Sequence, residues 1–204
     1  MENNISSADE LKTIRKMMEE STKFLSLSGF SGLFLGLFAL AGAIVAWFLI
    51  LGGGEDFDMN APGTTTWLLL SVDALAVLAL SLAAGFWFSW RNAKKAGKNF
   101  WNPASKRLLV SLFIPLAAGG LFAFILMLGN QSGLIIPVFL IFYGMALVNA
   151  GKFTYSDIFY LGILEIITGL IAAVFPSQGL LFWGFGFGIL HIVYGIMMYR
   201  KYEI

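Results

Sequence analysis

Six apolar stretches, separated by short polar segments, dominate the pattern along the chain. A helix needs roughly 20 apolar residues to cross a bilayer, because each residue adds about 1.5 Å and every backbone polar group must be bonded within the segment. The pattern therefore predicts six transmembrane helices, at residues 24–51, 67–90, 108–128, 134–150, 158–175 and 180–199.

The links between the last four spans are only a few residues long: GNQSG, GKFTYSD and PSQG. Because short links make consecutive helices antiparallel, we expect an all-α polytopic fold of three antiparallel hairpins. Ser7 and Glu10 have the spacing of a capping box and precede apolar residues on one helix face. Residues 1–23 are therefore predicted to form an amphipathic cytoplasmic helix, followed by a six-span domain at residues 24–204.

The composition supports a membrane protein. Hydrophobic residues make up 58% and charged residues 12% of the 204 positions, whereas a soluble domain has about 25% charged residues. The absence of cysteine excludes disulfides, thiolate nucleophiles and iron–sulfur clusters, and the single histidine excludes a multi-histidine metal site. We therefore predict no cofactor and no metal. The net charge of +1 gives no indication of a nucleic-acid partner.

All 13 Lys and Arg residues fall on one side of the predicted spans, and Glu55, Asp56 and Asp58 lie in a loop on the other side. The positive-inside rule makes the basic side cytoplasmic, with both termini inside, in a prokaryotic cytoplasmic membrane. Residues 91–107 carry six cations and no acid, which would suit an RNA or phosphoinositide patch, but a topology signal needs the same residues and is commoner. Residues 8–23 and 91–107 are also the surface on which we expect a cytoplasmic protein partner.

Three spans carry stripes of small residues spaced by three or four positions, which let helix backbones approach closely in lipid. These helix-packing residues are Gly32 and Gly36 in the first span, Gly162 and Gly169 in the fifth, and Gly184, Gly188 and Gly195 in the sixth. Such stripes permit a homo-oligomer as readily as contacts within one chain.

The stripes of spans five and six each contain one ionisable side chain, Glu165 and His191. Folding the two spans back at the PSQG turn predicts that the stripes face each other, with Glu165 and His191 within hydrogen-bond reach near the middle of the membrane. Asp73 in span two lies at a similar depth. These three residues form the candidate intramembrane polar site, because ionisable groups in spans are costly and often functional.

Two interpretations of this site stay open: an interhelical clamp, or the proton or substrate site of a small proton-coupled transporter or its membrane-embedded substrate-binding subunit. An enzyme is not predicted. Ser132 and His191 superficially resemble the serine and histidine of rhomboid proteases. However, their predicted depths differ by about 16 Å, too far for a hydrogen bond between nucleophile and base.

The segment GILEIITGLIAAVFPSQGLLFWGFGFGILHIVYGI, Gly162 to Ile196, resembles the hairpin unit of the small six-helix HdeD-like acid-resistance membrane proteins. The resemblance implies a non-enzymatic inner-membrane role linked to stress, with no catalytic residues to transfer. The N-terminal helix, the acidic loop, Glu165 and His191 depart from that pattern. The leading expectation is an integral membrane scaffold, sensor or stress-protection protein.

Overall fold

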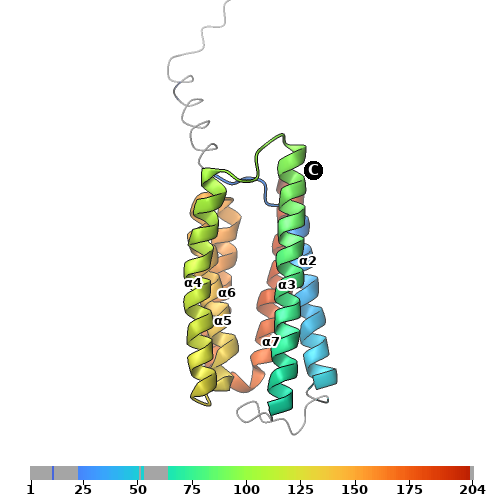
Figure 1. Ribbon diagram of the computed structural model, residues 1–204, viewed down its shortest axis with the longest axis vertical. Coiled ribbons are helices and arrows are strands. Elements are labelled where there is room, and N and C mark those ends of the chain that lie inside the picture. Colours follow the sequence, from blue (N-terminus) through green and yellow to red (C-terminus); the bar gives the residue numbers. More distant parts are fainter. Residues whose placement is uncertain (1–10, 12–22, 51, 53–63, 203–204) are drawn as a thin grey trace, which may run out of the picture.

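The computed structural model describes Leu11, residues 23–50, Gly52 and residues 64–202, and all regular structure in these ranges is helical (Figure 1). Six helices are long and apolar enough to cross a membrane, which confirms the predicted all-α fold with six spans. They cover Gly29–Leu49, Thr65–Lys95, Pro103–Leu128, Ser132–Phe153, Ser156–Val174 and Pro176–Tyr202. The predicted amphipathic helix, apart from Leu11 and Lys23, and the acidic loop lie outside the described residues.

The first three spans are nearly continuous helices: α2 (Gly29–Val45) with the π-helical turn η1 (Ala46–Ile50), then α3 (Thr64–Lys95) and α4 (Pro103–Leu128). The fourth span consists of η2 (Ser132–Leu134), α5 (Ile135–Ala150) and η3 (Gly151–Phe153), and the fifth is α6 (Ser156–Val174). The sixth begins with η4 (Pro176–Gln178) and α7 (Gly179–Trp183), and continues as the π-helix η5 (Gly184–Leu190) and α8 (His191–Tyr202). The sixth span therefore changes helix type near its middle.

The helices form two groups, which Figure 1 shows side by side. The first group contains α2, α3 and the sixth span, and the second group contains α4, α5 and α6. In the first group α2 packs against both α3 and α8, and in the second α5 packs against both α4 and α6. The predicted arrangement of three hairpins is not confirmed, because the main partner of α6 is α5 and the main partner of α8 is α2.

Glycines explain this pairing, because they bring helix backbones into direct contact. A Cβ atom on Gly144 of α5 would lie 2.6 Å from the carbonyl oxygen of Gly162 on α6. A Cβ atom on Gly36 of α2 would likewise lie 2.6 Å from the carbonyl oxygen of Gly188 in η5. Real Cβ atoms do not approach other atoms this closely, so each pair of helices requires glycine where they cross.

The prediction that the stripes of spans five and six face each other is therefore wrong. Gly162 and Gly169 face α5, whereas Gly188 and Gly195 face α2. Gly32 and Gly36 supply the α2 side of the second contact. The sixth span turns its small residues to the first span because α2 carries a matching stripe. Gly184 lies near Leu40 and Ala43 with ordinary room for a Cβ atom.

The first membrane helix begins at Gly29, five residues later than the predicted start at residue 24. Ser28 caps it, since its side chain accepts a hydrogen bond from the backbone N–H of Phe30. Residues 24–28 are non-helical, and we call them the strap. The backbone N–H of Phe24 donates to the Phe153 carbonyl at 2.7 Å, and the Thr154 hydroxyl donates to the Phe24 carbonyl at 2.8 Å. The strap therefore joins the start of α2 to the second group.

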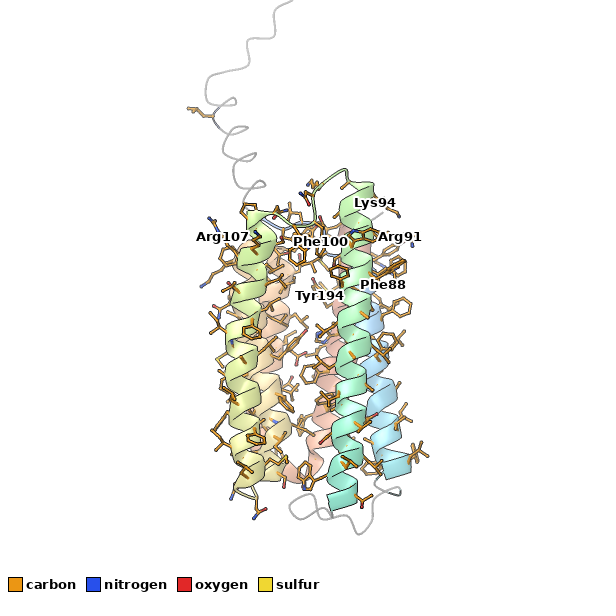
Figure 2. The ribbon with its side chains drawn as sticks, viewed as in Figure 1. Phe88, Arg91, Lys94, Phe100, Arg107 and Tyr194 are labelled. Carbon is orange, nitrogen blue, oxygen red and sulfur yellow. The ribbon has the colours of Figure 1, made fainter. Side chains whose placement is uncertain are left out.

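The strap lies at the end of the molecule that carries the described Lys and Arg residues, which we call the basic end. Phe24 belongs there to a buried cluster with Ala104, Leu108, Leu147 and Leu161. Phe100, from the loop between α3 and α4, packs its ring edge-on against Phe24 with centroids 5.4 Å apart. Figure 2 shows Phe100 and Tyr194 between the two groups near this end. Apolar packing therefore joins the groups at the basic end.

Candidate functional site

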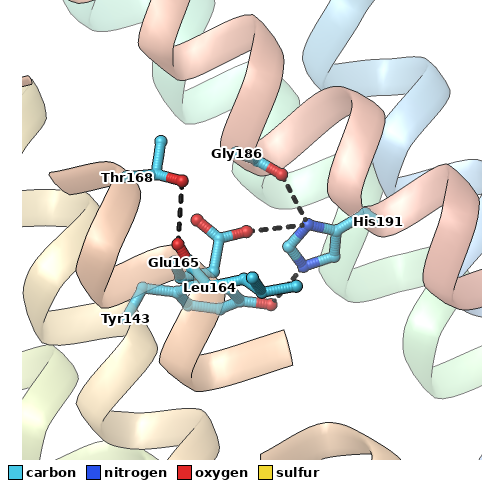
Figure 3. Close-up of polar contacts among 6 residues, drawn as sticks. All are labelled: Tyr143, Leu164, Glu165, Thr168, Gly186 and His191. Carbon is cyan, nitrogen blue, oxygen red and sulfur yellow. Dashed lines mark hydrogen bonds and ion pairs between the residues drawn. The ribbon is translucent and has the colours of Figure 1, made fainter. Parts of the chain in front are cut away.

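Side chains from three spans meet at the contact between the two helix groups (Figure 3). Glu165 comes from α6, Tyr143 from α5 and His191 from the start of α8. The exposed fraction is 0% for Glu165 and 3% for His191, although both side chains are polar. We call these three residues the polar link, because Tyr143 and Glu165 belong to the second group and His191 belongs to the first.

Both ring nitrogens of His191 have partners. Nδ1 lies 3.1 Å from the carbonyl oxygen of Gly186, and Nε2 lies 2.7 Å from the hydroxyl of Tyr143. A carbonyl oxygen only accepts, so the geometry assigns a hydrogen to Nδ1. In a neutral imidazole Nε2 then accepts from the Tyr143 hydroxyl, and every hydrogen-bonding group of the ring is satisfied.

Glu165 is the incompletely satisfied member of the polar link. Its Oε1 lies 3.4 Å from His191 Nδ1, but neither carboxyl oxygen has a hydrogen bond in the described structure. The hydroxyl of Thr168, one turn along α6, donates to the Leu164 carbonyl at 2.8 Å instead. A buried polar group without a hydrogen bond costs about 1–3 kcal/mol. The carboxyl group of Glu165 is therefore where a proton or a donor group would be stabilised.

The π-helix η5 shapes this site. Its carbonyl at Gly186 accepts the Nδ1 hydrogen bond, so the ring of His191 is fixed by its own span. A Cβ atom on Gly186 would lie 2.6 Å from Glu165 Oε2, so glycine is needed for the carboxyl group to fit. Glycine-rich sequence disfavours a regular α-helix, and π-helical turns often occur at functional sites. The segment GFGFG thus positions both ionisable side chains.

Asp73 lies elsewhere. It projects from α3 towards α2, where its Oδ2 would be 3.3 Å from a Cβ atom on Gly42. The main packing partner of α3 is α2, and α3 is the least buried of the six spans. The structure therefore brings Glu165 and His191 together but leaves Asp73 outside the polar link.

Ser132 does not belong to the polar link either. It lies in η2, at the end of the molecule opposite the basic end. The two nitrogens of His191 are occupied by Tyr143 and Gly186. A serine–histidine pair of the protease type therefore has no basis in this geometry.

A second polar contact joins α6 to α8 at the basic end. Lys201 Nζ lies 3.0 Å from both carboxylate oxygens of Asp157, and the Tyr202 hydroxyl donates to Asp157 Oδ2 at 2.9 Å. Tyr155, beside Asp157, packs against the tilted ring of Tyr202 with ring centroids 4.2 Å apart, and its hydroxyl donates to the carbonyl of Leu25 in the strap at 2.7 Å. We call this contact the basic-end latch.

The sequence did not predict the contact of Tyr143 with His191 or the basic-end latch. A tyrosine in the middle of a span is a signal, because its hydroxyl needs a partner in lipid. Nothing in the local pattern connects Asp157 with Lys201, which are 44 positions apart.

Comparison with family models, curated proteins and solved structures finds no match to this chain. In the described part of the chain, no cluster of three or more His, Cys, Asp or Glu residues is arranged to hold a metal ion.

Proposed function

We propose that this integral membrane protein is a non-enzymatic scaffold of the sensor type, in which the polar link sets the relative position of the two helix groups. The observation that carries the proposal is the fully buried Glu165 carboxyl group against His191, where the groups meet. Tight packing, with the Gly186 backbone against the carboxyl group, supports this role over a substrate site.

The second reason is that α6 and α8 are joined at two levels. Along α6, Glu165 lies about 12 Å from Asp157, and along α8, His191 lies about 15 Å from Lys201, because each helical residue adds about 1.5 Å. A shift of α8 at His191 would therefore change the basic-end latch. We propose that the protein senses a change at Glu165, either a change in its protonation or the arrival of a hydrogen-bond donor.

We propose that a cytoplasmic partner detects the change at the basic end. The Tyr155 hydroxyl of the latch donates a hydrogen bond to the Leu25 carbonyl in the strap. In the sequence the strap directly follows residues 1–23. Residues 8–23 and 91–107 would face the cytoplasm, where a protein partner binds them and responds to the position of the strap. The stress-related role implied by the HdeD-like resemblance fits a sensor of this kind and is part of the proposal.

A small proton-coupled transporter is the second candidate. The observation that favours it is that both carboxyl oxygens of Glu165 lack hydrogen bonds, which leaves them free to take up a proton. In this candidate Glu165 and His191 carry the coupling. Asp73 would act separately, because it belongs to α3 and lies beside Gly42 of α2, outside the polar link.

Pulsed spin-label distance measurements can test the sensor proposal, because the chain has no native cysteine to interfere. Labels at Lys152→Cys and Arg200→Cys report on the second and first group, respectively, at the basic end. In lipid nanodiscs we expect Glu165→Gln and His191→Ala each to broaden the distance distribution, because the polar link is lost.

Tyr194→Phe is the matched control, since Tyr194 is a neighbouring half-buried tyrosine whose hydroxyl makes no hydrogen bond to the described residues. It should leave the distribution unchanged. Identical distributions in all variants would contradict the sensor proposal. Proton uptake into proteoliposomes by wild type, lost in Glu165→Gln, would favour the transporter instead.

A further inference from the structure

The basic end of α3 carries cations that form no ion pair with the described residues. Arg91, Lys94 and Lys95 are all exposed. No acidic residue occurs in the chain between Asp73 and Asp157. Of these two, Asp157 binds Lys201, and Asp73 lies about 27 Å from Arg91 along the helix. Within the part of the chain that the structure describes, this charge is therefore not neutralised and is available to an external anion.

The same helix face carries two exposed tryptophans directly below the cations. Trp87 is 57% exposed and Trp90 is 39% exposed. Their ring centroids are 5.9 Å apart, and Lys94 Nζ lies 5.5 Å from the centroid of Trp90. Indole rings prefer the boundary between acyl chains and headgroups, so the ammonium group lies at headgroup level.

Aromatic packing fixes the opposite side of this part of α3 and the loop that follows it. Phe88, the neighbour of Trp87, packs against Phe30 and Phe34 of α2, with ring centroids 6.0 and 5.2 Å away. After α3 the loop is anchored by Phe100 between the helix groups, as Figure 2 shows. The cations labelled there, Arg91 and Lys94, lie on the outer side of α3, away from Phe100. The face is thus presented to the surrounding lipid.

We infer that this face binds an anionic phospholipid, with the headgroup phosphate against Arg91 and Lys94 and an acyl chain along Trp87. The arrangement fits a lipid better than a soluble polyanion, because the cations continue directly into an exposed apolar and aromatic surface. This goes beyond the topological role of the cations, since it assigns a defined lipid contact to one helix face.

Native mass spectrometry of the detergent-solubilised full chain tests the inference, with phosphatidylglycerol and phosphatidylcholine of equal acyl length as probes. We expect wild type to retain phosphatidylglycerol at least about tenfold more strongly, because each nearby cation attracts an anionic lipid. Arg91→Gln/Lys94→Gln should lose most of this preference. Trp87→Leu should weaken the binding of both lipids.

Lys152→Gln/Arg200→Gln is the matched control, because it removes the same charge from exposed positions at the same end. It should keep the preference for phosphatidylglycerol. Three results would overturn the inference: no preference in wild type, an equal loss in both double variants, or binding of a short RNA by wild type without any lipid preference. A fold check by thermal unfolding accompanies each variant.

Discussion

The contacts within each helix group and the contact between the groups are built differently. Within the groups, glycines bring backbones together, as at Gly144 and Gly162 or Gly36 and Gly188. Between the groups, α6 and the sixth span touch over a smaller region, where the polar link and the basic-end latch lie. Close backbone packing leaves no room for change, whereas a polar contact depends on the hydrogens and charges it holds. We therefore expect each group to be rigid and the contact between the groups to be the adjustable part.

The largest expected effect comes from filling a glycine contact. Gly162→Leu puts a Cβ atom 2.7 Å from the Gly144 carbonyl oxygen and 2.8 Å from the Val148 nitrogen. Since backbone cannot move aside locally, we expect a loss of more than about 3 kcal/mol of stability. Size-exclusion chromatography and thermal unfolding in detergent would show little folded protein. Gly120→Leu is the control, because nothing lies within 4 Å of a Cβ atom there; equal damage in both variants would refute the packing argument.

The next largest effect is expected at the polar link. His191→Ala removes the partner of the Tyr143 hydroxyl and of the Gly186 carbonyl and leaves Glu165 without its nearest polar neighbour. We expect a loss of about 2–3 kcal/mol of stability, measured by denaturant titration in mixed micelles. The effect of Glu165→Gln should be smaller in the His191→Ala background than in wild type, because residues in contact are energetically coupled. Additive effects would show that the two side chains do not act together.

A more selective change removes one hydrogen bond. Tyr143→Phe deletes only the hydroxyl 2.7 Å from His191 Nε2. Interhelical hydrogen bonds in membranes contribute about 0.6 kcal/mol on average, so we expect a loss of up to about 1 kcal/mol. Tyr194→Phe should be neutral in the same unfolding assay. A neutral Tyr143→Phe would mean that the hydrogen bond contributes nothing to holding the groups together.

The smallest effect is expected at the basic-end latch. Asp157→Asn removes the charge that binds Lys201 but keeps an acceptor for the Tyr202 hydroxyl. Because the ion pair is exposed, the loss of stability at low salt should be smaller than that of Tyr143→Phe. The loss should vanish near 1 M salt, where charges separated by more than about 3 Å are largely screened from each other. Unfolding at both salt concentrations measures this. A loss that persists at high salt would show that the latch acts by packing instead of charge.

The sequence by itself determined the six spans, the gathering of the described cations at one end and the proximity of Glu165 and His191. Span length follows from membrane thickness, and the depth of each residue follows from its distance to the PSQG turn, so neither depends on which helices pack together. The start of the first helix was misplaced because residues 24–28 are as apolar as a span. Their non-helical course depends on Thr154 and Tyr155, which are about 130 residues away.

Only the tertiary structure decided which stripes pair, and with them the two groups. Every glycine stripe is compatible with every other, so their pairing depends on the simultaneous fit of all six helices. The same fit placed Tyr143 on His191, left Asp73 beside Gly42, and turned Gly186 towards Glu165. Local pattern sets depth and burial, but the choice of neighbour is a global property of the packing.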